Sequence, residues 1–129
     1  MLDMAAVIAT HFANDTDITA PVYADSLPEG VSYPYVLVRN PNVGVLLPGI
    51  DGWDVYEVQV DMVAAHDAAG ALIDLVGIVR SKLSALTGVV GAAGIAGTVI
   101  TSTTKTVDDT VSPARPRWVL TVEVTASSI

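Results

Sequence analysis

The chain has 129 residues, and its 14 acidic and 6 basic side chains give a net charge of −8. This length predicts a single domain, 1–129, and the negative balance argues against binding to phosphate backbones, which depends on Lys and Arg. The sequence has no cysteine, which excludes disulfides and thiolate metal sites, and its start at Met1 lacks the basic and apolar segments of a secretory signal.

The first half of the chain predicts one helix followed by three strands. The helix covers 2–13 and ends at the polar run 14–17, and short strands follow over 21–24 and 34–40. Its expected buried side consists of Leu2, Ala5, Ala6, Ala9 and Phe12. A strand over 54–65 shows a period of two, which predicts one buried and one solvated face. The inward residues are Tyr56, Val58, Val60, Met62 and Ala64, and the outward residues are Glu57, Gln59 and Asp61.

The second half predicts a long helix and two more strands. The helix covers 67–86, with Asp67 as its N-cap and Gly88 as its stop signal. Its apolar stripe is formed by Ala68, Leu72, Leu75, Val76, Val79, Leu83 and Leu86. The glycine-rich segment 88–97 is interpreted as a flexible loop, and strands are expected over 98–107 and 117–126. The last strand places Trp118, Leu120, Val122 and Val124 inward, and Thr121, Glu123 and Thr125 outward.

This order of elements predicts an α+β fold. The sheet is expected to be mainly antiparallel or mixed, with the N-terminal helix and the long helix packed on one face. The segment 83–104 carries no charge and is long enough to cross a bilayer, but its glycines, serines and threonines argue against a transmembrane helix.

Residues that carry chemistry are few and scattered. His11 and His66 are isolated and lack the spacing of metal ligands. Asp108 and Asp109 have side chains that can bind a metal, but two adjacent carboxylates in a polar hairpin are more often part of a solvated turn. The glycines of 88–97 match neither phosphate-binding motif. The sequence therefore predicts no catalytic residue, no cofactor and no metal.

The remaining features are surfaces that suit contact with partners. The chain is 51% hydrophobic but only 5% aromatic, and much of its apolar surface falls outside the expected core. A loop over 43–53 is unusually apolar, through Val43, Val45, Leu46, Leu47, Ile50 and Trp53. It either folds back over its own core as a lid or docks on another subunit, and we favour docking. The far face of the long helix is small and scarcely charged, through Gly70, Asp74, Gly77 and Ser81.

Two arginines flank Pro116 in the last part of the chain. Arg115 and Arg117 would hold either a phosphate or a carboxylate of a partner, and for so acidic a chain we favour the carboxylate. Arg39 is a further candidate for a subunit interface.

Four segments give the chain a recognisable layout after its N-terminal helix. They are "PYVLV" (34–38), "YEVQVDMVA" (56–64), "VRSKL" (79–83) and "RWVLTVEV" (117–124). This layout resembles the tail terminator and minor tail (tail-completion) proteins of long-tailed bacteriophages. The resemblance covers nearly the whole chain and lies in the pattern of elements rather than in a single diagnostic residue.

The resemblance implies a non-enzymatic virion protein at the head-proximal end of the tail. Such a protein forms a ring, expected to be a hexamer, that caps the tail tube, ends its polymerisation and offers a surface for head–tail joining. Its partners would be copies of itself, the major tail tube protein and head–tail connector proteins. DNA would only pass through the channel, whose expected lining is Glu57, Gln59, Asp61, Thr121 and Glu123.

A ring also needs a head-to-tail interface, in which one patch meets a different patch on the next copy. The loop 43–53 is the candidate on one side, and the small-residue helix face or Arg39 is the candidate on the other. The alternatives are another tail-completion, connector or tube-like role, and a small ligand-binding domain.

Overall fold

A computed structural model describes residues 2–42, 44–49 and 52–129 of the chain. Its elements, in chain order, are α1 (Met4–Ala13), β1 (Val22–Ala24), β2 (Tyr35–Arg39), β3 (Asp54–Val63), α2 (Ala69–Ser84), β4 (Gly88–Val90), β5 (Ala93–Asp108) and β6 (Arg115–Ser128). The helices and strands expected from the sequence are all present within a few residues of their predicted bounds, and β4 is an addition.

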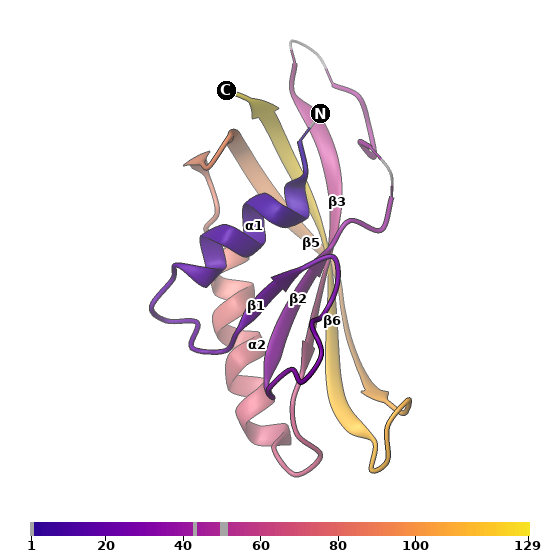
Figure 1. The fold of residues 1–129 in the computed structure, drawn as a ribbon. Helices are drawn as coiled ribbons and strands as arrows, with labels where there is room; N and C mark the ends of the chain where they lie inside the picture. Colours follow the sequence, from indigo (N-terminus) through magenta and orange to yellow (C-terminus); the bar gives the residue numbers. More distant parts are fainter. Residues whose placement is uncertain (1, 43, 50–51) are drawn as a thin grey trace.

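The strands form one mixed sheet in the order β1-β2-β3-β6-β5-β4. β1 runs parallel to β2, and the other neighbouring pairs are antiparallel. Both helices lie against the same face of this sheet, and the β5–β6 hairpin lies at the end of the sheet where α2 begins (Figure 1). The predicted α+β class, with a mixed sheet and helices on one face, is therefore confirmed.

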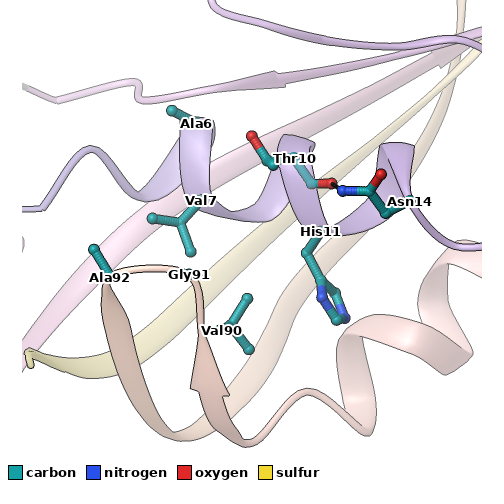
Figure 2. A pocket seen from close by; sticks show the side chains of 8 residues that line it. All are labelled: Ala6, Val7, Thr10, His11, Asn14, Val90, Gly91 and Ala92. Atoms are coloured by element: carbon teal, nitrogen blue, oxygen red, sulfur yellow. Dashed lines mark hydrogen bonds between the residues drawn. The ribbon is translucent and has the colours of Figure 1, made fainter.

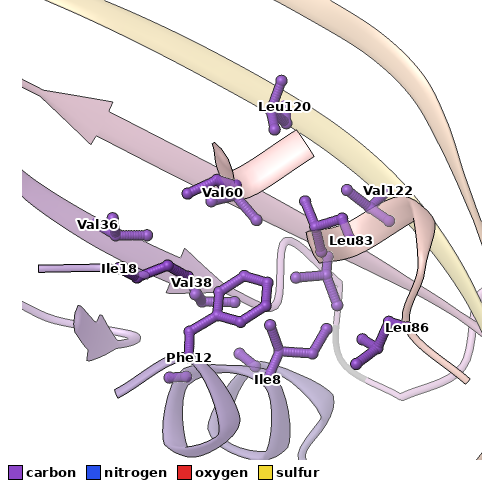
Figure 3. Packing of buried hydrophobic residues seen from close by; sticks show 14 of the residues in the cluster. Ile8, Phe12, Ile18, Val36, Val38, Val60, Leu83, Leu86, Leu120 and Val122 are labelled. Atoms are coloured by element: carbon purple, nitrogen blue, oxygen red, sulfur yellow. The ribbon is translucent and has the colours of Figure 1, made fainter. Parts of the chain in front are cut away.

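The main core lies between the two helices and the sheet (Figure 3). The alternation predicted for β3 and β6 is confirmed on this side, where Tyr56, Val58, Val60 and Met62 lie across from Leu120, Val122 and Val124. In α1 the buried side is rotated slightly from the prediction. Met4 and Ile8 are fully buried together with Ala5, Ala9 and Phe12, while Leu2 and Ala6 stay partly exposed.

The long helix keeps its predicted apolar stripe but not its predicted ends. Leu72, Leu75, Val76, Val79 and Leu83 are its buried residues. The N-cap is Ala68, which makes no side-chain cap hydrogen bond, and Asp67 is exposed. A turn in which the Ala68 amide donates to the carbonyl of Ala65 (3.0 Å) moves the helix start past Asp67. The prediction of Asp67 as N-cap was therefore wrong.

The glycine-rich segment 88–97 forms a β-hairpin instead of the predicted flexible loop. β4 pairs with the first residues of β5, through Gly88↔Ile95 and Val90↔Ala93. Gly91 lies in the turn with a positive φ of 56°, a backbone conformation that glycine adopts without steric cost. The alternation of Val90, Ala93 and Ile95 into the core stabilises the hairpin. β5 consequently begins at Ala93 rather than at residue 98.

Within the described residues, no helix is both long enough and apolar enough to cross a membrane. The uncharged segment 83–104 is divided between the end of α2 and the β4–β5 hairpin. Its buried side chains, among them Leu83, Val90 and Ile95, belong to the core of this domain.

Candidate functional site

The sheet has an outer face, defined here by the strand residues that point away from α1 and α2. Because neighbouring side chains in a strand alternate between the two faces, the residues that lie between the core residues of β3 and β6 fall on this face. The register pairs Glu57 with Glu123, Gln59 with Thr121 and Asp61 with Val119. All the residues predicted to line a channel, Glu57, Gln59, Asp61, Thr121 and Glu123, are therefore brought together on one face.

Asp61 departs from its predicted solvated environment. It is only 3% exposed, and its carboxylate accepts hydrogen bonds from the guanidinium groups of Arg39 and Arg117, the latter at 3.1 Å. Gln59 Nε2 donates to the same carboxylate at 3.2 Å. β2 and β6 flank β3 on its two sides, which is why their arginines converge on one carboxylate. Asp61 lies on the predicted face, but the expectation that this face leaves it solvated was wrong.

The two arginines are thus engaged within their own chain. The side chains of Arg39 and Arg117 remain 38% and 30% exposed. Together they carry one positive charge more than the Asp61 carboxylate neutralises, and this charge faces solvent. Arg39 Nε is buried and has no hydrogen-bond partner among the residues that the structure describes. Arg115 does not pair with Arg117. It stacks on the ring of Tyr33, with its guanidinium carbon 4.1 Å from the ring centroid.

Glu57 and Glu123 create an acidic centre on the outer face. They are directly opposite each other in the register of β3 and β6, and like charges in that position destabilise a sheet. Asn42 Nδ2 donates to Glu57 Oε1 at 3.2 Å and offsets part of this repulsion. A chain that keeps two facing carboxylates retains negative charge on this surface at some cost in its own stability.

A second apolar cluster, not predicted from the sequence, covers one end of the outer face. Tyr35, Leu37 and Val63 are buried there under the connection between β1 and β2, whose Leu27 and Val31 pack against them. Burial raises the pKa of the Tyr35 hydroxyl above its ordinary value. Bulky residues on both faces of β2 were the available signal, because a strand buried on both faces loses its alternation.

The described part of the apolar loop folds back along its own chain, and docking on another subunit stays a prediction. Val45 packs against the main core, and Leu46 and Leu47 return alongside β3, with the Val55 amide donating to the Leu47 carbonyl at 2.9 Å. The side chains of Leu47 and Trp53 nevertheless remain 60% and 41% exposed. Val43 and Ile50, also predicted interface residues, lie outside the described residues.

Further exposed apolar side chains gather near Trp53 on the outer face. A Cβ on Gly94 would lie 3.9 Å from the Trp53 ring and 3.3 Å from the Ile129 side chain. Val89, the strand partner of Gly94, and Ile129 are 74% and 72% exposed. The Trp53 ring therefore lies near Gly94 on the sheet, beside apolar groups that solvent still reaches.

The far face of α2 is exposed as the sequence predicts. Gly70, Asp74, Gly77 and Ser81 are all on the solvent side, with the exposed Ile73 beside them. At its end, Lys82 Nζ binds the carboxylates of Asp15 and Asp17 at 3.2 and 2.6 Å. Hydrogen bonding to Asp17 raises the pKa of the Lys82 ammonium group.

Gly77 is expected to weaken the isolated domain. It lies inside α2, and a Cβ placed there would meet no atom of the described residues within 4 Å. Gly77→Ala should therefore raise the free energy of unfolding by about 0.5–1 kcal/mol. Urea denaturation measures this change, and Ala71→Gly on the same exposed side should lower stability by a similar amount. An unchanged or lower stability of Gly77→Ala would show that the position has an intramolecular constraint.

A groove of about 460 Å³ lies between α1 and the β4–β5 turn. Figure 2 shows Val7 and His11 extending from α1 toward Val90 and Gly91. The remaining lining residues are Ala6, Thr10, Asn14 and Ala92. The Asn14 side-chain amide donates to the Thr10 carbonyl at 3.0 Å, so this donor is already used within α1. The sequence did not indicate this groove, because it depends on the unpredicted strand β4.

Groups of three or more His, Cys, Asp or Glu side chains with metal-binding placement do not occur in the part of the chain that the structure describes. No protein-family model and no curated protein matches the sequence. The molecule offers three surfaces for contact with partners. They are the acidic and hydroxyl-bearing outer face of the sheet, the exposed apolar side chains at one end of that face, and the far face of α2 with its small side chains.

Proposed function

We propose that this chain is a structural protein of a bacteriophage tail, which forms a ring at the end of the tail tube. In this role it ends tube polymerisation and provides the surface for head–tail joining. The chain acts by contact with copies of itself, with the tail tube protein and with connector proteins, and has no enzymatic activity. Its place is the head-proximal end of the tail in the virion. The proposal rests on the resemblance of the element pattern together with the surfaces described above.

The outer face of the sheet is the observation that carries the proposal. In the ring this face lines the channel, with Glu57 and Glu123 at its centre and Gln59 and Thr121 beside them. Carboxylates repel the phosphates of passing DNA, and the neutral side chains of Gln59 and Thr121 add no positive charge that would attract them. The burial of Asp61 between two arginines changes the expected lining, because Arg39 and Arg117 together carry one positive charge more than Asp61 neutralises, so Glu57 and Glu123 supply the negative charge of this face.

The exposed apolar surfaces support assembly rather than a monomeric role. Leu47, Trp53, Val89 and Ile129 are large, apolar and exposed, although an ordinary soluble chain of this size gains by burying such side chains. The far face of α2, where Gly70 and Gly77 have open space above them, offers a second region where another backbone can approach closely. Contacts with further copies, with the tail tube or with a connector protein would cover these surfaces.

A small ligand-binding domain is the competing class of function. It would need a pocket with convergent polar groups. The groove beside α1 offers His11, Thr10 and Asn14 as its polar lining, and Asn14 is already bonded to the backbone of its own helix. This arrangement favours an apolar occupant over a polar small molecule.

The decisive experiment is electron microscopy of tails assembled without this protein. The proposal predicts overlong tubes, because nothing stops polymerisation, and adding the purified chain should restore a uniform length. Tails of normal length that fail to join heads would instead favour a connector role. Tails of normal length that join heads normally would contradict both.

A further inference from the structure

We infer that residues 44–49 of one copy dock in the groove between α1 and the β4–β5 turn of the next copy, with the Leu47 side chain inserted. This inference rests on the proposed ring and specifies the contact that holds neighbouring copies together. The sequence predicted the far face of α2 or Arg39 as the surface that receives the loop, and the inference assigns the α1 groove instead.

The donor loop is already ordered for such a contact. The Leu46 amide donates to the Val55 carbonyl at 2.8 Å, and the Val55 amide donates to the Leu47 carbonyl at 2.9 Å. The Gly49 amide donates to Asp54 Oδ1 at 3.0 Å. A Cβ at Gly49 would collide with the carbonyl oxygen of Trp53, so glycine allows this close return of the chain. The backbone holds Leu47 outward, and docking of a preordered loop costs less conformational entropy.

The acceptor groove has the size and lining for an aliphatic side chain. Its volume of about 460 Å³ exceeds that of a single leucine side chain, so part of the loop backbone enters with it. Small residues leave the groove open on both sides, Ala6 on α1 and Gly91 and Ala92 in the turn. Val7 and Val90 provide apolar contacts at its base (Figure 2).

The positions of loop and groove fit a head-to-tail contact. β2 pairs only with the half of β3 from Gln59 to Val63, so the other half of β3 has the loop at its free edge. At the same end of the sheet, β4 forms the opposite edge. The loop and the β4–β5 turn accordingly lie on opposite sides of the molecule (Figure 1). Such a heterologous contact repeats in one direction from copy to copy and closes into a ring when the rotation permits.

Electrostatics selects this groove over the hollow on α2. Copies that each carry a net charge of −8 repel one another, so their contacts should avoid unpaired carboxylates. Residues 44–49 contain no charged side chain, and the lining of the α1 groove contains no Asp or Glu. The hollow along α2 is instead lined by Asp17 and Asp74 as well as by Lys82. Contact between two acidic copies therefore buries less negative charge at the α1 groove than at the hollow along α2.

Cysteine pairing tests the contact directly, because the chain contains no cysteine of its own. Leu47→Cys and Ala92→Cys proteins, mixed under mild oxidation at high concentration, should form an intermolecular disulfide, which requires Cα atoms within about 7 Å. The matched control replaces Ala92→Cys by Ile73→Cys, an exposed residue on the far face of α2. The inference predicts clearly faster cross-linking of the first pair. Equal rates for the two pairs, or faster cross-linking through Ile73, would overturn it.

A second variant separates this contact from the ring itself. Leu47→Asp is expected to leave circular dichroism and thermal unfolding unchanged, because the side chain is exposed, while lowering the fraction of closed oligomers about tenfold in native mass spectrometry. Ile73→Asp is the control and should assemble normally. Rings that persist in Leu47→Asp would overturn the inference and leave the proposed ring intact. Cross-linked copies that never close into rings would support the contact and count against the proposed function.

Discussion

Asp61→Asn should lower the free energy of unfolding by about 2–3 kcal/mol, which is a large share of the stability of a domain of this size. The substitution keeps the volume of the side chain but removes the charge that Arg39 and Arg117 share. Both guanidinium groups would then lie close together on a half-buried surface without compensation. The partial exposure of the arginines places the effect below that of a fully buried pair. Thermal unfolding should shift by roughly 10 °C.

A triple variant distinguishes charge from packing as the cause. Asp61→Leu combined with Arg39→Met and Arg117→Met removes all three charges and fills similar space, and it should recover most of the lost stability. If Asp61→Asn unfolds at the wild-type temperature, the ion pairs have little effect on stability. If the triple variant is as unstable as the single one, the cause lies in packing.

Replacement of both Glu57 and Glu123 by Lys should convert the assembled ring into a DNA-binding surface. The net charge of each chain changes from −8 to −8 + 4 = −4, and the added lysines lie together on the outer face. Repeated around a ring, they would release counterions from the DNA. We expect an affinity for double-stranded DNA that falls roughly 100-fold or more between 50 and 200 mM salt, and little binding by the wild type.

The matched control has the same net charge but its lysines elsewhere. Asp67→Lys with Asp109→Lys changes two exposed residues, one before α2 and one in the β5–β6 hairpin. Electrophoretic mobility assays of the two assembled variants should show binding by the Glu57 and Glu123 variant alone. Equal binding by the two variants would mean that DNA responds to the net charge of the chain and does not contact the outer face in particular.

The fold was predictable from the sequence to the extent that periodicity determines it. Alternation in β3 and the apolar stripe of α2 gave the correct buried faces, because a half-buried element must segregate its apolar side chains. The parallel pairing of β1 and the order of strands in the sheet depend on contacts distant in sequence, so local patterns did not reveal them. The β4–β5 hairpin was missed because its glycines outweighed the short apolar alternation around them.

The candidate surfaces were predictable only as lists of residues. Asp61 shows the limit, because its position in an alternating strand correctly gave its face but not its burial. Its environment depends on Arg39 and Arg117, which reach it from two neighbouring strands. The exposure of Leu47 and Gly77 was predictable from position, because Leu47 falls in a loop between two strands and Gly77 lies opposite the apolar stripe of α2. The groove beside α1 required the position of a strand that the sequence had not indicated.

The orientation of the sheet within the assembled ring tests the central claim most directly. Cryo-electron microscopy of tails with the bound protein should place the outer face toward the channel, with Glu57 and Glu123 lining it and α1 and α2 on the outside. A ring whose helices face the channel, with Glu57 and Glu123 on the outer wall, would contradict the account.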